Sequence, residues 1–84
     1  MYKELAKKYI KRLTPQDIKN YATSINVQLD NQEVNIIFDF LLKNYEDLLN
    51  KNTSVFKDLK PRIRNDLYNK IISLYEENKN KYLN

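Results

Sequence analysis

The chain has 84 residues, a formal net charge of +4, and no glycine, histidine or cysteine. These absences remove the residues of glycine-rich phosphate loops, the commonest general base and metal ligand, and the thiol nucleophile. They also exclude a disulfide framework, so we expect one domain, residues 1–84, that depends on its apolar core and works in a reducing, cytoplasmic setting.

Two short helices are predicted in the first third of the chain. Apolar residues recur at helical spacing over about 2–13, with basic residues on the opposite side, which is typical of an amphipathic helix. A second helix is predicted over about 15–25, because Thr14 is a suitable cap and Pro15 suits the first helical position. Asn26 is the expected left-handed terminator in a chain without glycine.

The longest predicted helix covers about 31–50 and forms the centre of the fold. Asp30 and Glu33 have the spacing of a capping box at its start. Ile36 and Phe40 lie off its main apolar stripe, four residues apart. A helix that is apolar on more than one side is either central in the core or faces a partner, so both alternatives stay open for these two residues.

The last third predicts a short helical turn over about 54–60 and a final helix over about 61–80, with Pro61 as its first residue. Tyr68 and Ile72 widen the apolar stripe of this final helix. No segment alternates strictly between apolar and polar residues, as a half-buried strand would. We therefore predict an all-α fold, a compact bundle of four helices plus a short helical turn. No apolar run reaches the ~18 residues of a membrane span, so no transmembrane segment is expected.

Charge is distributed in three blocks along the chain. Residues 1–28 carry a net charge of +4, residues 29–50 carry −4 and residues 51–84 carry +4. One interpretation is complementarity between packed helices, and the other is a basic surface for nucleic acid or anionic lipid. The candidate basic patch has two clusters: Lys3, Lys7, Lys8, Lys11 and Arg12, and Lys57, Lys60, Arg62 and Arg64.

No pattern of residues indicates catalysis, a cofactor or a metal site. Three carboxylates are assigned to helix caps, and the adjacent pairs Glu46-Asp47 and Glu76-Glu77 diverge by about 100° on a helix. We therefore expect a non-enzymatic protein without a cofactor, a module that binds a protein partner or a second copy of itself. The candidate interface consists of Ile36, Phe40, Tyr68 and Ile72.

The alternative function is sequence-independent binding of nucleic acid along the basic patch. It requires the two basic clusters to lie side by side, because together they could follow a phosphate backbone. Sequence-specific binding by a helix–turn–helix is not supported. Ala22-x-x-x-Asn26-Val27 is similar to the core of that motif, but the helix after it is acidic and has its apolar residues out of register.

A resemblance to a known family covers about a quarter of the chain. It is carried by Leu13-Thr14-Pro15-Gln16-Asp17-Ile18, Tyr21-Ala22, Asn26-Val27, Leu29 and Glu33-Val34. This pattern resembles the YqfT-like proteins, short uncharacterised proteins of low-GC Gram-positive bacteria. The resemblance implies a small cytoplasmic helical protein of bacterial origin, and it assigns no functional residue.

Overall fold

Five α-helices and two short 3₁₀ turns form the fold in the described residues. The structure, a computed structural model, describes residues 2–82, apart from the side chains of residues 2, 3, 80 and 82. In chain order the elements are α1 (Tyr2–Arg12), α2 (Pro15–Ser24), α3 (Asn31–Leu49), a 3₁₀ turn (Thr53–Val55), α4 (Phe56–Leu59), a second 3₁₀ turn (Lys60–Arg62) and α5 (Asn65–Tyr82). The predicted all-α class is confirmed.

Capping boxes fix the starts of α2 and α3. At α2, the Thr14 hydroxyl accepts from the Asp17 backbone N–H at 3.2 Å, and the Thr14 N–H donates to the Asp17 carboxylate at 2.9 Å. At α3, Asp30 and Glu33 make the same two bonds, at 2.7 and 3.0 Å. Each box satisfies two backbone N–H groups that would otherwise lack a partner within the helix, which is why both predicted boundaries are confirmed.

The ends of α2 and α3 adopt the left-handed conformation without glycine. Asn26 has φ of 61° and confirms the predicted terminator, and Lys51 has φ of 63° just after α3. Both ends form the same pair of backbone bonds. After α2, the Val27 N–H donates to the Ala22 carbonyl and the Asn26 N–H to the Thr23 carbonyl. This Schellman geometry satisfies carbonyls that the helix leaves unpaired, and it offsets the cost of a left-handed residue that has a Cβ.

The final helix begins at Asn65, so the predicted start at Pro61 is wrong. Pro61 lies instead in the second 3₁₀ turn, and Ile63 is extended, with φ of −135° and ψ of 164°. The extended backbone lets the half-buried Ile63 side chain pack against the core before the chain turns into α5. The Tyr68 N–H then donates to the Arg64 carbonyl in the first turn of α5.

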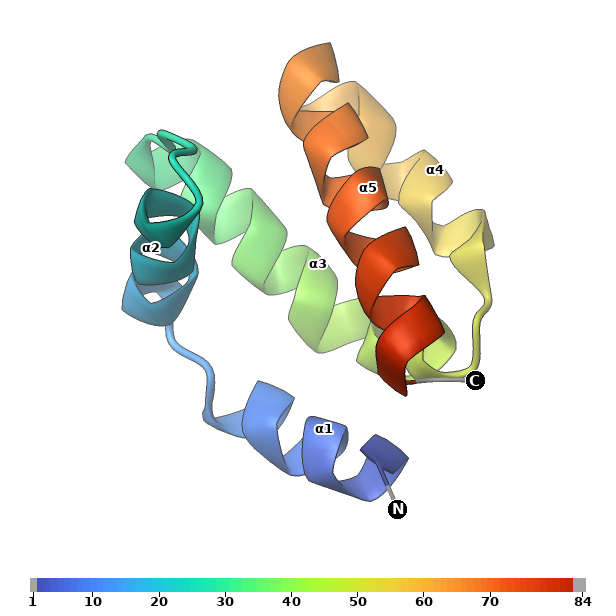
Figure 1. Ribbon diagram of the computed structural model, residues 1–84. Helices are drawn as coiled ribbons and strands as arrows, with labels where there is room; N and C mark the ends of the chain where they lie inside the picture. Colours follow the sequence, from blue (N-terminus) through green and yellow to red (C-terminus); the bar gives the residue numbers. More distant parts are fainter. Residues whose placement is uncertain (1, 83–84) are drawn as a thin grey trace.

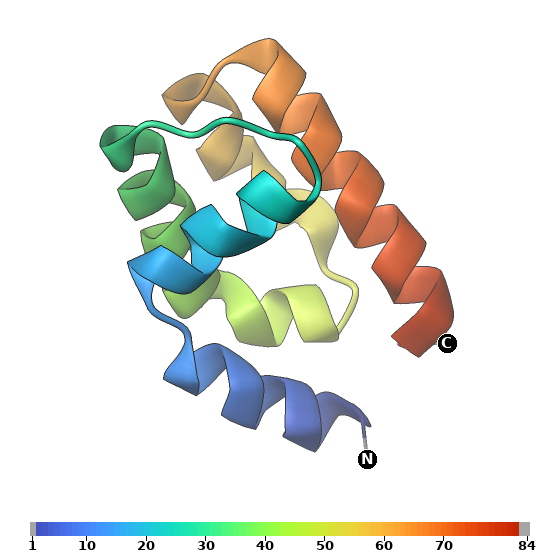
Figure 2. The ribbon, with the colours of Figure 1, turned by 60° about the vertical axis from the view of Figure 1, so that its left-hand side comes forward.

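The helix α3 lies at the centre of the fold. α1 and α2 both pack against it, and the views in Figure 1 and Figure 2 show α4 and α5 on the other side of the molecule from α2. The core cluster consists of Phe40, Leu48, Phe56 and Leu59. The Phe56 ring lies 5.5 Å from the Phe40 ring and 5.4 Å from the Tyr75 ring, between ring centroids. The radius of gyration of 12.3 Å is close to the ~12 Å of a compact domain of this length.

Candidate protein-binding groove

An apolar groove of about 790 Å³ is lined by α1 and α2 on one side and α5 on the other, with α3 contributing between them. Its walls are almost entirely aliphatic and aromatic side chains. Among these are Leu5, Tyr9, Tyr21, Leu41, Ile71 and Leu74. The buried Phe40 and Leu59 lie at its base. We call this space the groove.

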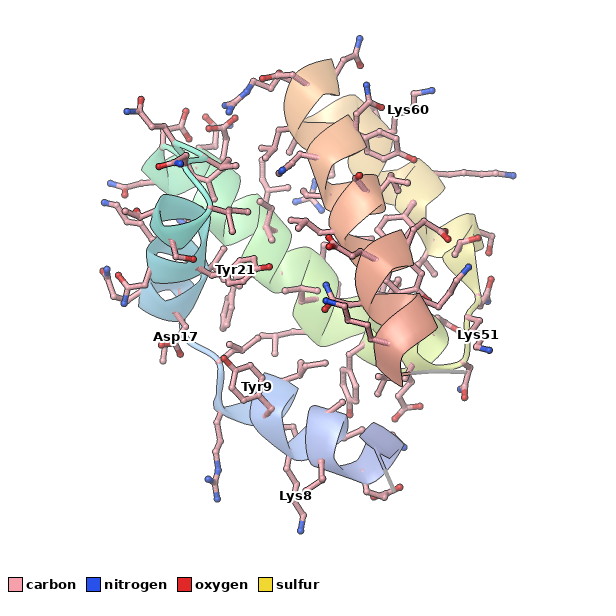
Figure 3. The ribbon with its side chains drawn as sticks, in the orientation of Figure 1. Lys8, Tyr9, Asp17, Tyr21, Lys51 and Lys60 are labelled. Atoms are coloured by element: carbon pink, nitrogen blue, oxygen red, sulfur yellow. The ribbon has the colours of Figure 1, made fainter. Side chains whose placement is uncertain are left out.

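Three apolar side chains of the groove wall are strongly exposed to solvent. Leu5 is 64% exposed, Tyr9 68% and Tyr21 52%. Figure 3 shows both tyrosines in the space between α1 and α2. All three belong to the two short amphipathic helices that the sequence predicts at the start of the chain, and in the structure they are largely exposed. Ala6 and Ile10, on the same stripe of α1, are half-buried and also line the groove, so the rest of the fold covers this stripe only in part.

Basic side chains line the groove on its α5 side. Lys70 and Lys79 of α5 line it, whereas Asp17 is the one carboxylate among the described lining residues. Lys79 forms an ion pair with Glu76 at 2.8 Å, and the hydrogen bond from Lys79 to Glu76 raises the pKa of Lys79. On α1, the exposed Lys8 does not line the groove, and Figure 3 shows it pointing away from the other helices.

The candidate interface residues lie mainly within the core. Phe40 is 3% exposed, so its ring is part of the core and contributes little surface to the groove that it lines. Ile36, Tyr68 and Ile72 are half-buried and pack against the core cluster. The Lys60 ammonium lies 5.8 Å from the centroid of the Tyr68 ring. Of the two alternatives that the sequence left open for Ile36 and Phe40, the structure favours completion of the core.

The two basic clusters do not form one surface. Figure 3 shows Lys8 and Lys60 at opposite ends of the molecule, and a separation seen in one projection cannot be smaller in space. The first cluster lies on α1 and contains Lys7, Lys8, Lys11 and Arg12; Lys3 belongs to it in sequence, but its side chain lies outside the described residues. The second cluster contains Lys57, Lys60, Arg62 and Arg64.

Two of the four residues in the second cluster make ion pairs with the acidic middle block. Arg62 lies 3.7 Å from the Asp39 carboxylate. Arg64 pairs with Glu33 and donates to the Gln28 carbonyl at 3.1 Å. These contacts support the interpretation of the charge blocks as complementarity between packed helices. They also reduce the positive charge that this cluster presents to a ligand.

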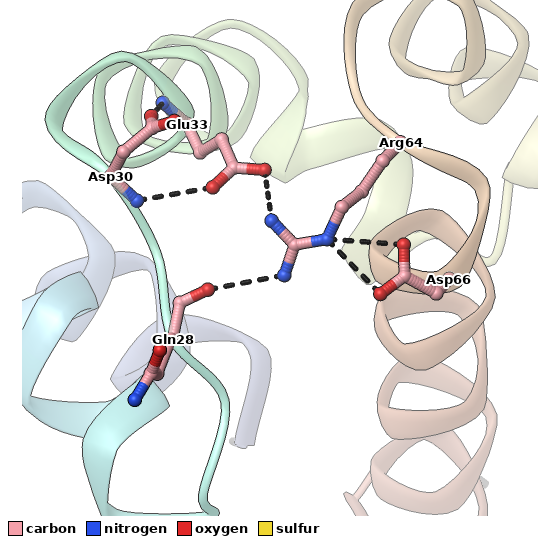
Figure 4. Close-up of polar contacts among 5 residues, drawn as sticks. All are labelled: Gln28, Asp30, Glu33, Arg64 and Asp66. Carbon is pink, nitrogen blue, oxygen red and sulfur yellow. Dashed lines mark hydrogen bonds and ion pairs between the residues drawn. The ribbon is translucent and has the colours of Figure 1, made fainter.

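Arg64 connects the link before α3 with the first turn of α5 (Figure 4). Its Nε donates to the Asp66 carboxylate at 3.0 Å, in addition to its contacts with Glu33 and Gln28. The hydrogen bond between Arg64 and Asp66 raises the pKa of Arg64 and lowers the pKa of Asp66. This cluster is a structural connection between the two sides of the fold and lies apart from the residues that line the groove.

No family model, curated protein or solved structure matched this chain. The resemblance to the YqfT-like proteins therefore stays a prediction.

Two further observations concern other kinds of site. Within the described part of the chain, no three acidic, histidine or cysteine side chains gather in a way that could hold a metal ion. Every helix in residues 2–82 is too short or too polar to span a bilayer. The groove is therefore the strongest candidate for a functional site, and the sequence signals that could have found it are Leu5, Tyr9 and Tyr21 on short amphipathic helices.

Proposed function

We propose that this protein is a non-enzymatic interaction module that binds a protein partner in the groove. The observation that carries the proposal is the exposure of Leu5, Tyr9 and Tyr21 along one continuous apolar space of about 790 Å³. Tyrosine supplies a large contact area at a low cost in side-chain entropy and is enriched at protein interfaces. A partner that fills the groove would complete the burial that α1 and α2 leave unfinished.

The total accessible surface area of the chain favours the existence of a protein partner. The chain exposes 5996 Å², about 700 Å² more than the ~5300 Å² expected for a compact monomer of this mass. A protein–protein interface of standard size buries about 800 Å² on each partner. The excess therefore has the size of one side of a stable interface, which favours a protein as the occupant.

The proposal includes a cytoplasmic location and a single domain. A chain without cysteine has no thiol that needs oxidising for stability, which suits a reducing compartment. Binding of nucleic acid along both basic clusters receives no support, because the clusters lie at opposite ends of the molecule. The protein-binding groove is accordingly the function that we retain.

Site-specific photo-crosslinking tests the proposal. A photoreactive phenylalanine analogue replaces Tyr21, inside the groove, or Leu42, which is 41% exposed but lies outside it. Both proteins are expressed in the source cell and irradiated. We expect a discrete protein adduct from position 21 and none from position 42. Equal adducts from both positions, or none from position 21, would contradict a groove-directed interaction.

A further inference from the structure

We infer that the occupant of the groove is a partner's amphipathic α-helix whose polar face is acidic. This inference rests on the proposed function and narrows it to one chemistry of partner. It is based on the length and cross-section of the groove, on the cations along its α5 side and on the net charge of the chain.

The dimensions of the groove fit one face of a helix. The lining residues of α5 extend from Leu67 to Lys79, which is about 18 Å along a helix, or just over three turns. Dividing 790 Å³ by that length gives a cross-section of about 44 Å², roughly half that of an α-helix with its side chains. The groove thus has room for a row of large side chains while the rest of the helix stays in solvent, which is the geometry of helix-in-groove recognition.

The charges around the groove select an acidic partner. Lys70 and Lys79 line it on α5, where Lys79 is paired with Glu76, and the chain as a whole carries a net charge of +4. Asp17 is the only carboxylate among the described residues that line the groove. Acidic side chains beside the apolar face of a docked helix would meet these cations, and such complementarity raises the association rate and disfavours basic competitors.

A second copy of this chain fits the groove less well. Each copy carries a net charge of +4, so two copies repel. The amphipathic helix that a second copy would offer most readily is α1, because its Leu5 and Tyr9 are exposed. That helix is itself basic, with Lys11 and Arg12 in its last turn. Inserting it would bring cations beside Lys70 and Lys79.

The first experiment compares synthetic peptides as probes. The acidic probe has leucines at i, i+3, i+4, i+7, i+8 and i+11 and glutamate or alanine elsewhere. A matched basic probe replaces each glutamate by lysine, and a scrambled acidic probe keeps the composition but loses the apolar stripe. Each peptide carries a fluorophore, and binding is measured by anisotropy. We expect the acidic probe to bind at least about tenfold tighter than either control at low salt. At about 0.5 M salt, the difference in affinity between the acidic and the basic probe should become smaller, because salt screens the charges.

Matched protein variants place the binding in the groove. Tyr9→Ser removes an exposed groove residue, and Leu42→Ser removes an exposed apolar residue outside the groove. Lys70→Glu reverses a groove charge, and Lys57→Glu makes the same change in net charge on α4. We expect Tyr9→Ser and Lys70→Glu each to lower the affinity for the acidic probe by about tenfold. The two control substitutions should lower it by less than about twofold. Circular dichroism establishes that each variant is folded.

Several results would overturn the inference. One is that the basic probe binds as tightly as the acidic probe or more tightly. Another is that the scrambled probe binds as tightly as the acidic probe. A third is that Lys70→Glu leaves the affinity for the acidic probe unchanged. A concentration-dependent dimer that disappears in Tyr9→Ser, measured by light scattering, would assign the groove to a second copy. If position 21 captures a protein by photo-crosslinking while the acidic probe fails to bind, the interaction module stands and the acidic helix is wrong.

Discussion

Replacing Phe40 by alanine separates a core role from an interface role for this residue. Phe40 is 3% exposed, and its ring lies 5.5 Å from that of Phe56. Truncation of a buried phenylalanine costs about 3–5 kcal/mol, because apolar burial is lost and a cavity remains. A domain of this length has a total stability of only about 4–13 kcal/mol. Phe40→Ala is therefore expected to remove a large part of the free energy of unfolding.

Urea denaturation monitored by circular dichroism measures this loss. With a slope of about 1–1.5 kcal/mol per molar urea, a loss of about 4 kcal/mol would shift the midpoint by about 3 M. Phe40→Leu serves as the milder variant if Phe40→Ala does not fold. It keeps most of the volume but loses the aromatic pair, and it is expected to cost about 1–2 kcal/mol. Leu42→Ala is the control, because Leu42 is 41% exposed and lies outside the groove.

The control defines the result that would refute the reasoning. Leu42→Ala is expected to change stability by about 0.5 kcal/mol or less, as exposed substitutions do. If Phe40→Ala costs no more than this control, the ring is not part of the core in solution. The interface role that the sequence left open for Phe40 would then have to be restored.

Three other predictions concern single polar contacts. Thr14→Ala removes the capping box of α2 and should lower the free energy of unfolding by about 1 kcal/mol; an unchanged urea midpoint would contradict this. Tyr75→Phe removes the hydrogen bond that the hydroxyl donates to the Leu48 carbonyl and should cost about 1 kcal/mol. Burial also raises the pKa of Tyr75, so stability should fall as the pH rises above 10.0, and the phenylalanine variant should lose this dependence. The hydrogen bond from Arg64 lowers the pKa of Asp66. The contribution of the Asp66 carboxylate to folding stability is therefore present above pH 3.8 and is lost as the pH falls through the lowered pKa. An NMR titration of the Asp66 carboxyl in Arg64→Ala should return its pKa toward the ordinary value, and an unchanged titration would count against the pairing.

The helix boundaries that the sequence predicted best depend on local contacts. Thr14 and Asp30 cap α2 and α3 through bonds to residues only three positions away, so the pattern alone specifies them. Asn26 ends α2 because its side chain tolerates positive φ in a chain without glycine. In these places sequence and structure agree because the capping bonds themselves join residues only a few positions apart.

The start of α5 could not be read from the sequence, because two local solutions fit the same residues. Pro61 suits the first position of an α-helix and also a 3₁₀ turn. Ile63 decides between them, since its side chain packs against the core with its backbone extended. Arg64 adds a second long-range contact through Glu33, which holds the chain at this point.

The sequence analysis likewise did not locate the groove. The amphipathic pattern of α1 identifies an apolar side but not the edge of that side that docks on α3, and the choice exposes Leu5 and Tyr9 while Ile10 is half-buried. The same is true of Phe40, whose position off the main stripe fits a core or an interface equally well. Sequence alone determined an all-helical chain with its caps and its three charge blocks, since these depend on contacts within a turn or two and on composition. Tertiary structure alone decided which apolar residues remain in solvent and where the cations gather, because both depend on how the helices pack across the molecule.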